Sequence, residues 1–297
     1  MDKKGWIFFG AALLIFTGAV VSAASEVCHY DRTISIIGSV KTYEVQEDES
    51  LIEIARKFDL GYNEITEANP DLDPFVPGKG ARVALDTSWI LPDVGVCKGI
   101  IINLSELRLY FFSEQRGSQF VRTFPIGIGS EGTDTPVGEF SVIEKIVNPA
   151  WHVPKSIREE KPELPLVVPP GPDNPLGSHA LRLSLGDVLI HGTNRPWAVG
   201  RRDSHGCIRL YPEDIPQLFS LVPKGIPVTI VRQPVKIGTM NKRVYVEVHI
   251  EKSPTVENYF DEAVSLLKKK KLFSYVNMEK LRIAVDKGLG IPVDISN

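Results

Sequence analysis

Residues 188–210 have the sequence VLIHGTNRPWAVGRRDSHGCIRL. The apolar run at 188–190 is typical of a buried strand that ends at His191. Glycines follow this run, and glycine lets a chain turn back at little steric cost. We therefore expect a strand that ends at His191, followed by a segment whose glycines allow the chain to turn back so that Cys207 can meet His191.

Short β-rich runs continue this pattern toward the N-terminus. Branched and aromatic residues gather at 99–103, 107–112, 120–126 and 139–146, with Gly, Ser and Pro between the runs. Short strands without helices between them are typical of a sandwich or a barrel. The sequence therefore predicts a mainly β domain at 98–233, either a sandwich or a barrel.

A long irregular segment interrupts the strands just before residue 188. Its prolines are Pro149, Pro154, Pro162, Pro165, Pro169, Pro170, Pro172 and Pro175. Long ordered loops are usually functional. We expect this loop to form one wall of a substrate cleft, and a simple surface connection is the alternative.

The cysteine and the histidines of 188–210 predict nucleophilic chemistry. A thiol becomes a useful nucleophile when a base takes its proton or a cation lowers its pKa, and imidazole does both near neutral pH. His205 lies two residues from Cys207 and would share its face on an extended segment. His191 reaches Cys207 only through the fold, so the spacing leaves both histidines open as the base.

Residues 41–91 predict a small α/β module. Ser50 and Glu53 form a capping box in front of apolar residues at helical spacing. A second short helix is expected at 63–69, stopped by Pro70, and a strand at 81–85. The expected order is strand, helix, helix, strand.

The first 24 residues have the layout of a secretory signal peptide. Lys3 and Lys4 precede an apolar run at 6–21, and small residues follow at 22–25. The run is also long enough to stay in the inner membrane as an uncleaved anchor, which is the alternative.

The chain has three cysteines, an odd number for a compartment where thiols tend to be oxidised. Cys28 and Cys97 flank the small module. A disulfide between them would close a long loop and stabilise the fold by about 4 kcal/mol. We predict this bridge, and two reduced thiols are the alternative.

Charge and composition exclude some classes of function. The formal net charge is −3 and 43% of residues are hydrophobic. A nearly neutral chain gives no electrostatic reason to expect nucleic acid as a partner. The tail at 234–297 predicts a short α/β extension with a strand at 244–250 and helices at 259–267 and 279–287, packed on the β-domain or exposed to a partner protein.

The small module resembles a LysM domain, a family that binds glycans containing N-acetylglucosamine. The matching residues are Tyr43, Val45, Ser50, Leu51, Ile54, Ala55, Phe58, Ile65, Asn69, Pro70, Asp73 and Pro74. The resemblance implies a ligand groove between loops 49–51 and 70–78. Asp48 replaces the usual glycine of the first loop, and a module that only spaces the enzyme from the membrane is the alternative.

The β-domain resembles the YkuD-type L,D-transpeptidases, in the branch that carries a LysM module. The matching residues are Thr135, Pro136, Gly138, Phe140, Asn148, Pro149, Trp151, Asn174–Gly177, His191–Asn194 and Ser204–Leu210. The resemblance implies a β-sandwich domain that needs neither a cofactor nor a metal.

The same resemblance implies roles for the site residues. Cys207 is the expected nucleophile, and His191 is the expected general acid and base, oriented by the Gly192 carbonyl. His205 is expected to support the site, with the N–H groups of Gly206 and Cys207 facing the oxyanion. The other expected substrate-side residues are Ser204, Thr193, Asn194 and Arg209, whose guanidinium would hold a carboxylate or form a structural salt bridge.

The implied reaction joins peptidoglycan stem peptides in the periplasm. The cysteine attacks the third residue of a tetrapeptide, usually diaminopimelate, and releases D-alanine from a thioester acyl-enzyme. An amine then resolves the thioester as a 3–3 cross-link; a lipoprotein lysine or, in an L,D-carboxypeptidase, water are other acceptors. Carbapenems are expected to acylate the cysteine.

Two rival functions belong to other classes. One is a non-catalytic wall protein that only binds peptidoglycan. The other is a zinc hydrolase with His191, His205, Cys207 and His179 as ligands, since imidazole and thiolate bind zinc well.

Overall fold

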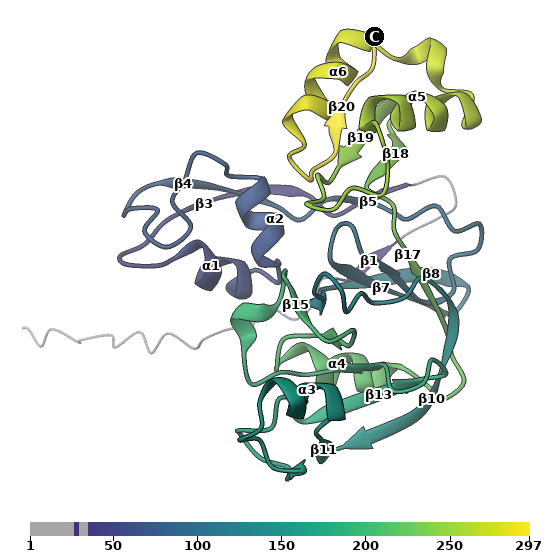
Figure 1. Cartoon of the computed structure of the whole chain (residues 1–297). Helices are drawn as coiled ribbons and strands as arrows, with labels where there is room; N and C mark the ends of the chain where they lie inside the picture. Colours follow the sequence, from purple (N-terminus) through teal and green to yellow (C-terminus); the bar gives the residue numbers. More distant parts are fainter. Residues whose placement is uncertain (1–26, 30–34) are drawn as a thin grey trace, which may run out of the picture.

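The structure is a computed structural model that describes residues 27–29 and 35–297 (Figure 1). The signal peptide predicted at 1–24 lies outside these residues. Within them, no helix combines the length and the apolar character needed to cross a membrane.

One large mixed sheet forms the centre of the chain. Its strand order is β1-β8-β7-β6-β17-β10-β13-β14-β16. The pairs β6–β17 and β14–β16 are parallel, and the other neighbours are antiparallel. The strands are β1 (Val27–His29), β6 (Gly99–Asn103), β7 (Arg108–Gln115), β8 (Ser118–Pro125), β10 (Gly138–Val147), β13 (His179–Leu183), β14 (Leu189–His191), β16 (Ile208–Arg209) and β17 (Pro227–Val231).

The sheet curls around its own core. Phe124 of β8 and Ile208 of β16, from opposite ends of the sheet, belong to one buried cluster, which also contains Ile215 and Leu218 of α4 (Asp214–Leu221). Gly127, just after β8, bridges back to Arg209 of β16. The mainly β class is confirmed, and the two walls of the expected sandwich are parts of one curled sheet.

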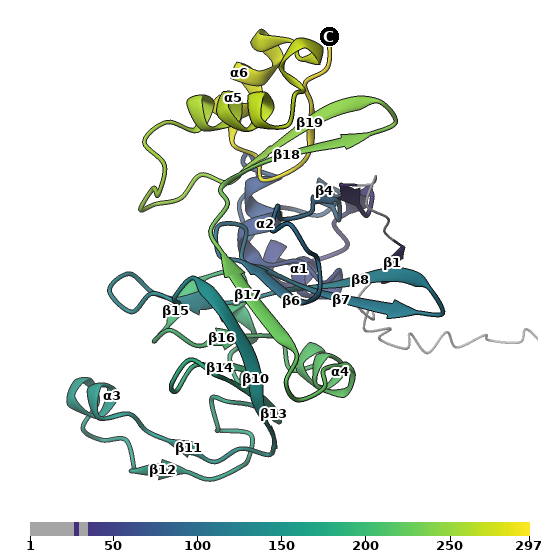
Figure 2. The same cartoon turned by 90° about the vertical axis from the view of Figure 1, so that its right-hand side faces the viewer.

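Several short elements connect the strands of this sheet. Segment 148–178, which we call the proline loop, lies beside β13 in both views (Figures 1 and 2). The remaining elements of this part are β9 (Ile128–Gly129), β11 (Trp151–His152), α3 (Lys155–Glu160), β12 (Val167–Val168), the 3-10 helix η1 (Pro196–Ala198) and β15 (Arg202–Ser204).

The LysM-like module has the predicted order of elements. Strand β3 (Val40–Glu44) pairs with β4 (Arg82–Asp86), and α1 (Leu51–Lys57) and α2 (Tyr62–Glu67) lie between them in the chain. The capping box forms as expected, with Ser50 Oγ accepting from the Glu53 N–H and the Glu53 carboxylate accepting from the Ser50 N–H. Strands β2 (Ile36–Ile37) and β5 (Trp89–Ile90) flank the module.

The C-terminal extension packs a three-stranded sheet against two helices. Its elements are β18 (Val235–Met240), β19 (Arg243–Val248), α5 (Tyr259–Lys269), η2 (Phe273–Tyr275), α6 (Met278–Lys287) and β20 (Val293–Asp294). The extension has an apolar cluster of its own. The expected helices are present, and α6 ends at Gly288, whose φ of 50° is left-handed. The boundaries expected at 91, 98 and 233 stay predictions.

A buried ion pair joins the LysM-like module to the central sheet. Arg108 Nε on β7 lies 2.7 Å from Glu64 Oε1 on α2, and their side chains are only 1% and 6% exposed. Trp89 Nε1 donates to the same carboxylate at 2.8 Å. Because a buried charge without a partner is very unfavourable, each partner requires the other.

A second buried network reaches the C-terminal extension. Lys236 Nζ lies 2.6 Å from Glu106 Oε2 and 2.7 Å from Glu247 Oε1. His249 contacts Glu247 at 2.8 Å and Glu67 of α2 at 3.3 Å. Burial alone would lower the pKa of His249, but these two carboxylates raise it to about 10. Charged groups from all three parts of the chain therefore meet in one buried cluster.

Cys28 and Cys97 are both half-buried and pack against the apolar cluster of the LysM-like module. The disulfide between them stays a prediction.

Arg108→Ala should lower the free energy of unfolding by about 3–5 kcal/mol, because it leaves the Glu64 carboxylate buried without its partner. Urea unfolding at pH 7 measures the effect. The matched control is Lys79→Ala, which removes one side of an exposed pair with Glu47 and should change little. The double change Glu64→Leu with Arg108→Met should recover most of the loss. An Arg108→Ala protein as stable as the control would contradict the account.

Candidate active site

The strand register places Cys207 and His191 on one face of the sheet. His191 on β14 pairs with Arg209 on the parallel strand β16. Paired residues share a face. Cys207 directly precedes β16, and it packs against Ala180, the partner of His191 on β13, so it lies on the face of His191 and Arg209. Ile190 and Ile208 point the other way, into the main core. One face of these strands therefore anchors the fold and the other carries the candidate site.

His191 is buried and held in one orientation. Its Nδ1 lies 2.6 Å from the carbonyl oxygen of Gly192. A carbonyl only accepts, so Nδ1 carries the proton of the neutral ring and Nε2 keeps a lone pair. Burial, with a further contribution from the Arg209 charge, lowers the pKa of His191 to about 4. The ring is therefore neutral at pH 7 and able to accept a proton.

Cys207 sits half-buried at the edge of a small apolar cluster. The sulfur packs against Leu176, Ala180 and Leu189, and Sγ lies 3.8 Å from the carbonyl oxygen of Asp187. Burial raises the pKa of the thiol, although a Leu189 backbone hydrogen bond and the Arg209 charge oppose it. The resting pair is therefore a neutral thiol and a neutral imidazole.

Arg209 supplies the positive charge beside both groups. Its Nη1 donates to the Asp203 carbonyl at 2.8 Å and lies 3.5 Å from the Asp203 carboxylate. The salt bridge considered from the sequence is thus present, and it leaves the other guanidinium N–H groups as potential donors. Holding a substrate carboxylate stays a prediction for this residue.

Side chains from two segments shape the turn before Cys207. Ser204 Oγ donates to the Cys207 carbonyl at 2.6 Å, and Thr135 Oγ1 donates to the Gly206 carbonyl at 3.0 Å. Gly206 has a φ of 97°, which a larger side chain rarely adopts. Thr135 was not among the expected site residues, although its motif with Pro136 was available as a signal.

Gly192, Thr193 and Asn194 shape the loop on the other side. A Cβ on Gly192 would lie 2.9 Å from a methyl carbon of Ile215, so the chain packs closely there. Thr193 Oγ1 accepts from the Arg195 N–H at 2.9 Å, and Asn194 Nδ2 donates to the Asp173 carbonyl at 3.0 Å. Their side chains therefore bind backbone, and contact with substrate stays a prediction.

His205 faces the proline loop. Its Nε2 lies 3.3 Å from Glu160 Oε2 on α3. Trp151 of the same loop packs against the cluster beside Cys207. The proline loop therefore borders the candidate site, as expected of a cleft wall, and the supporting role of His205 stays a prediction.

The histidines of the zinc alternative do not converge on Cys207. His179 alternates with Ala180, so it lies on the opposite face, where its ring packs at a tilt against Phe219 with centroids 4.6 Å apart. His205 turns to Glu160. In the described part of the chain, metal-ligand spacing occurs only at Glu106, Glu247 and His249, a group that Lys236 already bridges as the cation.

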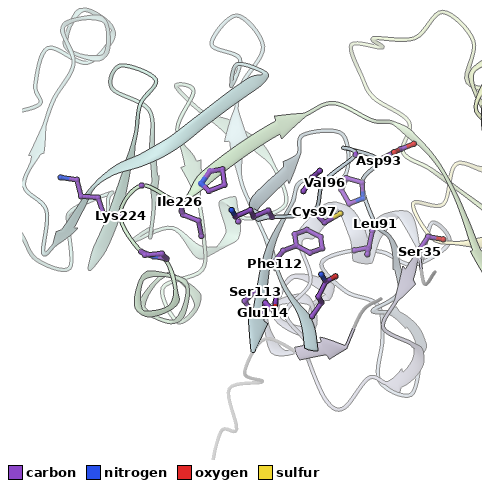
Figure 3. Close-up of a pocket in the computed structure, with 18 of the residues that line it drawn as sticks. Ser35, Leu91, Asp93, Val96, Cys97, Phe112, Ser113, Glu114, Lys224 and Ile226 are labelled. Carbon is purple, nitrogen blue, oxygen red and sulfur yellow. The ribbon is translucent and has the colours of Figure 1, made fainter. Parts of the chain in front are cut away.

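Figure 3 shows a hollow of about 960 Å³ whose lining includes neither Cys207 nor His191. Cys97, Phe112, Glu114, Lys224 and Ile226 are among its lining residues. His191, His205, Cys207 and Arg209 are absent from its lining, so the candidate site is separate from this hollow.

Comparison with known proteins agrees with this geometry. Residues 98–230 match the L,D-transpeptidase catalytic domain of the YkuD family, and residues 43–74 match the LysM domain. The "Probable L,D-transpeptidase YcfS" of Escherichia coli K12 is 37% identical over 88% of this chain and 85% of its own length. The "Probable L,D-transpeptidase YbiS" of the same strain is 41% identical over 68% of this chain and 66% of its own.

Among solved structures, the catalytic domain from the Enterococcus faecium L,D-transpeptidase aligns at 24% identity and a TM-score of 0.35, over 45% of this chain and 96% of that one. The match to YcfS, at 37% identity over most of both chains, establishes the protein family. This chain belongs to the YkuD family of L,D-transpeptidases and carries a LysM domain, so it is an enzyme that acts on peptidoglycan.

Replacing His191 with Gln should remove one pH-dependent part of the stability. An unfolded histidine binds a proton near pH 6.5, whereas the folded residue binds it only near pH 4. Between these values the unfolded state holds more protons, so wild type should lose about 2–3 kcal/mol more than His191→Gln as the pH falls from 7 to 4. Urea unfolding at both pH values gives the difference. The contribution of His249 to the pH dependence is the same in both proteins and cancels in the difference. If both proteins lost the same free energy of unfolding, the burial of a neutral His191 would be contradicted.

Proposed function

We propose that the chain is an L,D-transpeptidase in which Cys207 forms a thioester with a peptidoglycan stem peptide. The observation that carries the proposal is the parallel register that places a buried, neutral His191 and the Cys207 thiol on one sheet face. Because its pKa is lowered, the His191 ring is unprotonated at pH 7 and keeps a lone pair that can take the proton from a neutral thiol as the sulfur attacks.

In the first half-reaction, His191 Nε2 takes the thiol proton as Sγ attacks the carbonyl of the third stem residue. The N–H groups of Gly206 and Cys207 are the proposed donors to the oxyanion, and the turn held by Thr135 supports their positions. The carbon–nitrogen bond to D-alanine then breaks. The D-alanine amine takes the proton from His191 and leaves a thioester.

In the second half-reaction, an amine attacks the thioester and gives its proton to His191. The new amide forms as the carbon–sulfur bond breaks, and the thiol is restored. A stem-peptide amine would give a 3–3 cross-link and a lipoprotein lysine would give a protein–wall link, whereas water would give a carboxypeptidase product. We favour an amine, because the relatives are named as transpeptidases.

Neighbouring residues have proposed supporting roles. Arg209 holds a substrate carboxylate with the N–H groups that Asp203 leaves available. His205 joins the catalytic turn to the proline loop through Glu160. The LysM module holds the glycan strand, and the signal peptide proposed at 1–24 places the enzyme in the periplasm.

The function is tested by incubating residues 25–297 with a disaccharide-tetrapeptide and analysing the soluble products by mass. Wild type should release D-alanine and form a 3–3 dimer, and Cys207→Ala should form neither while keeping its unfolding midpoint. A tripeptide without dimer would indicate a carboxypeptidase. If wild type neither turns over nor forms an adduct, the chain is better described as a non-catalytic wall-binding protein.

The choice of base is tested by the rate at which a carbapenem acylates Cys207, followed by intact mass. Loss of a general base typically costs about 10²–10⁴-fold, so His191→Ala should slow acylation by that order. His205→Ala should slow it much less, because its ring contacts Glu160 on the proline loop. The reverse order of the two variants would reassign the base.

A further inference from the structure

A row of charged side chains leads away from Cys207 across the site face. Glu144 on β10 pairs with Arg182 on β13, and Arg182 pairs with Leu189 on β14. Extending the β14–β16 register by one residue sets Leu189 beside Cys207. These four residues therefore form one row across neighbouring strands, on the face that also carries His191.

Arg182 is held in place while much of its guanidinium stays available. Its Nε donates to Glu144 Oε2 at 2.8 Å, and the side chain is 33% exposed. Its Nη1 lies 3.7 Å from Asp187 Oδ1, which is too long for a hydrogen bond. The Nη edge can therefore bind a carboxylate through two parallel hydrogen bonds, a geometry that arginine favours.

Asp187 places a negative charge next to that edge. It lies on the turn between β13 and β14, and its carboxylate is fully exposed. Its own carbonyl oxygen is the group 3.8 Å from Cys207 Sγ. A guanidinium and a carboxylate thus stand a few ångströms apart beside the thiol, an arrangement complementary to a ligand that carries both charges on one carbon.

We propose that Arg182 and Asp187 form the subsite for the side chain of the acyl-donor residue, and that this side chain ends in both a carboxylate and an ammonium group. Arg182 binds the carboxylate and Asp187 binds the ammonium. The inference rests on the proposed function, and it deepens that function by assigning the residues that select a diamino acid of the diaminopimelate type over lysine.

The distances favour the donor over the acceptor. Arg182 lies two strands away from Cys207, so their Cα atoms are about 10 Å apart. The long arginine side chain brings its guanidinium closer to the thiol than this. A donor side chain places its charged end about four bonds, or roughly 5 Å, from the Cα next to the attacked carbonyl. The acceptor amine must instead reach the thioester itself, so its charges would lie beside His191 and not along the row.

The test measures acylation by three tetrapeptide donors that differ only in the third residue: diaminopimelate, diaminopimelate amidated at its far carboxylate, and lysine. Full-length protein is used, with hydroxylamine as a common uncharged acceptor, and kcat/KM is taken from hydroxamate formation. Wild type should prefer the first donor by about 10- to 100-fold, the typical effect of a hydrogen bond to a charged group.

Arg182→Gln should erase this preference by slowing only the first donor, and Arg182→Lys should restore part of it. Asp187→Asn should slow all three donors alike, because each presents an ammonium group. Arg243→Gln, which removes a guanidinium paired with Asp294 on the C-terminal hairpin, is the matched control and should change none of the rates.

Two results would overturn the inference while leaving the proposed function intact. One is equal use of the three donors by wild type, and the other is an Arg182→Gln protein that is slowed equally on all three, which would assign Arg182 a structural role. If no donor acylates wild type, the proposed function itself fails and the subsite fails with it.

Discussion

The parallel pairing of β14 with β16 is the constraint on which the site depends. These two short strands run side by side. Ile190 and Ile208 point into the core, and His191 and Arg209 lie together on the opposite face of the sheet. A slip of one residue would bury Cys207 and expose Ile208, so the apolar core selects the catalytic register. The energy that folds the sheet therefore also places Cys207, the proposed nucleophile, on the same face as His191, the proposed base.

Buried charge gives the rest of the chain a defined position relative to that site. Glu64 of α2 is bound to Arg108 of the central sheet. At the start of the same helix, the Tyr62 N–H donates to the Val199 carbonyl at 3.3 Å, and the Asn63 N–H donates to Gly200 at 3.3 Å. Residues 199 and 200 belong to the loop between His191 and Cys207. The LysM module thus contacts the loop that leads from His191 to Cys207, the two proposed catalytic residues.

Local signals in the sequence predicted most of the architecture. The capping box at Ser50 and the stop at Gly288 follow from short-range chemistry. The buried pairs of Arg108 and Lys236 could not be predicted, because a charged residue is normally assigned to the surface and its partners lie far away in the chain. The hairpin strand β18 was also missed, since its lysine, glycine and threonine hide the alternation.

The two histidines show where spacing reasoning fails. On an extended segment His205 would share a face with Cys207. The left-handed Gly206 between them breaks that extension, and His205 turns to Glu160. His191 is favoured as the proposed base only once β14 pairs with β16, and these strands cannot be paired from the sequence spacing alone. The row that joins Glu144, Arg182, Leu189 and Cys207 could not be predicted either, because these residues lie far apart in the sequence and come together only through strand pairing.

The proposed mechanism starts from a neutral His191 imidazole and a neutral Cys207 thiol, and the ultraviolet absorbance of the thiolate tests this starting state most directly. The difference between wild type and Cys207→Ala, recorded from pH 5 to pH 10, isolates the Cys207 thiolate. Because burial raises the pKa of this thiol above its ordinary value of 9.0, the account predicts no thiolate signal at neutral pH, with or without His191→Gln. A thiolate present at pH 6 and lost in His191→Gln would show a preformed ion pair and contradict the account.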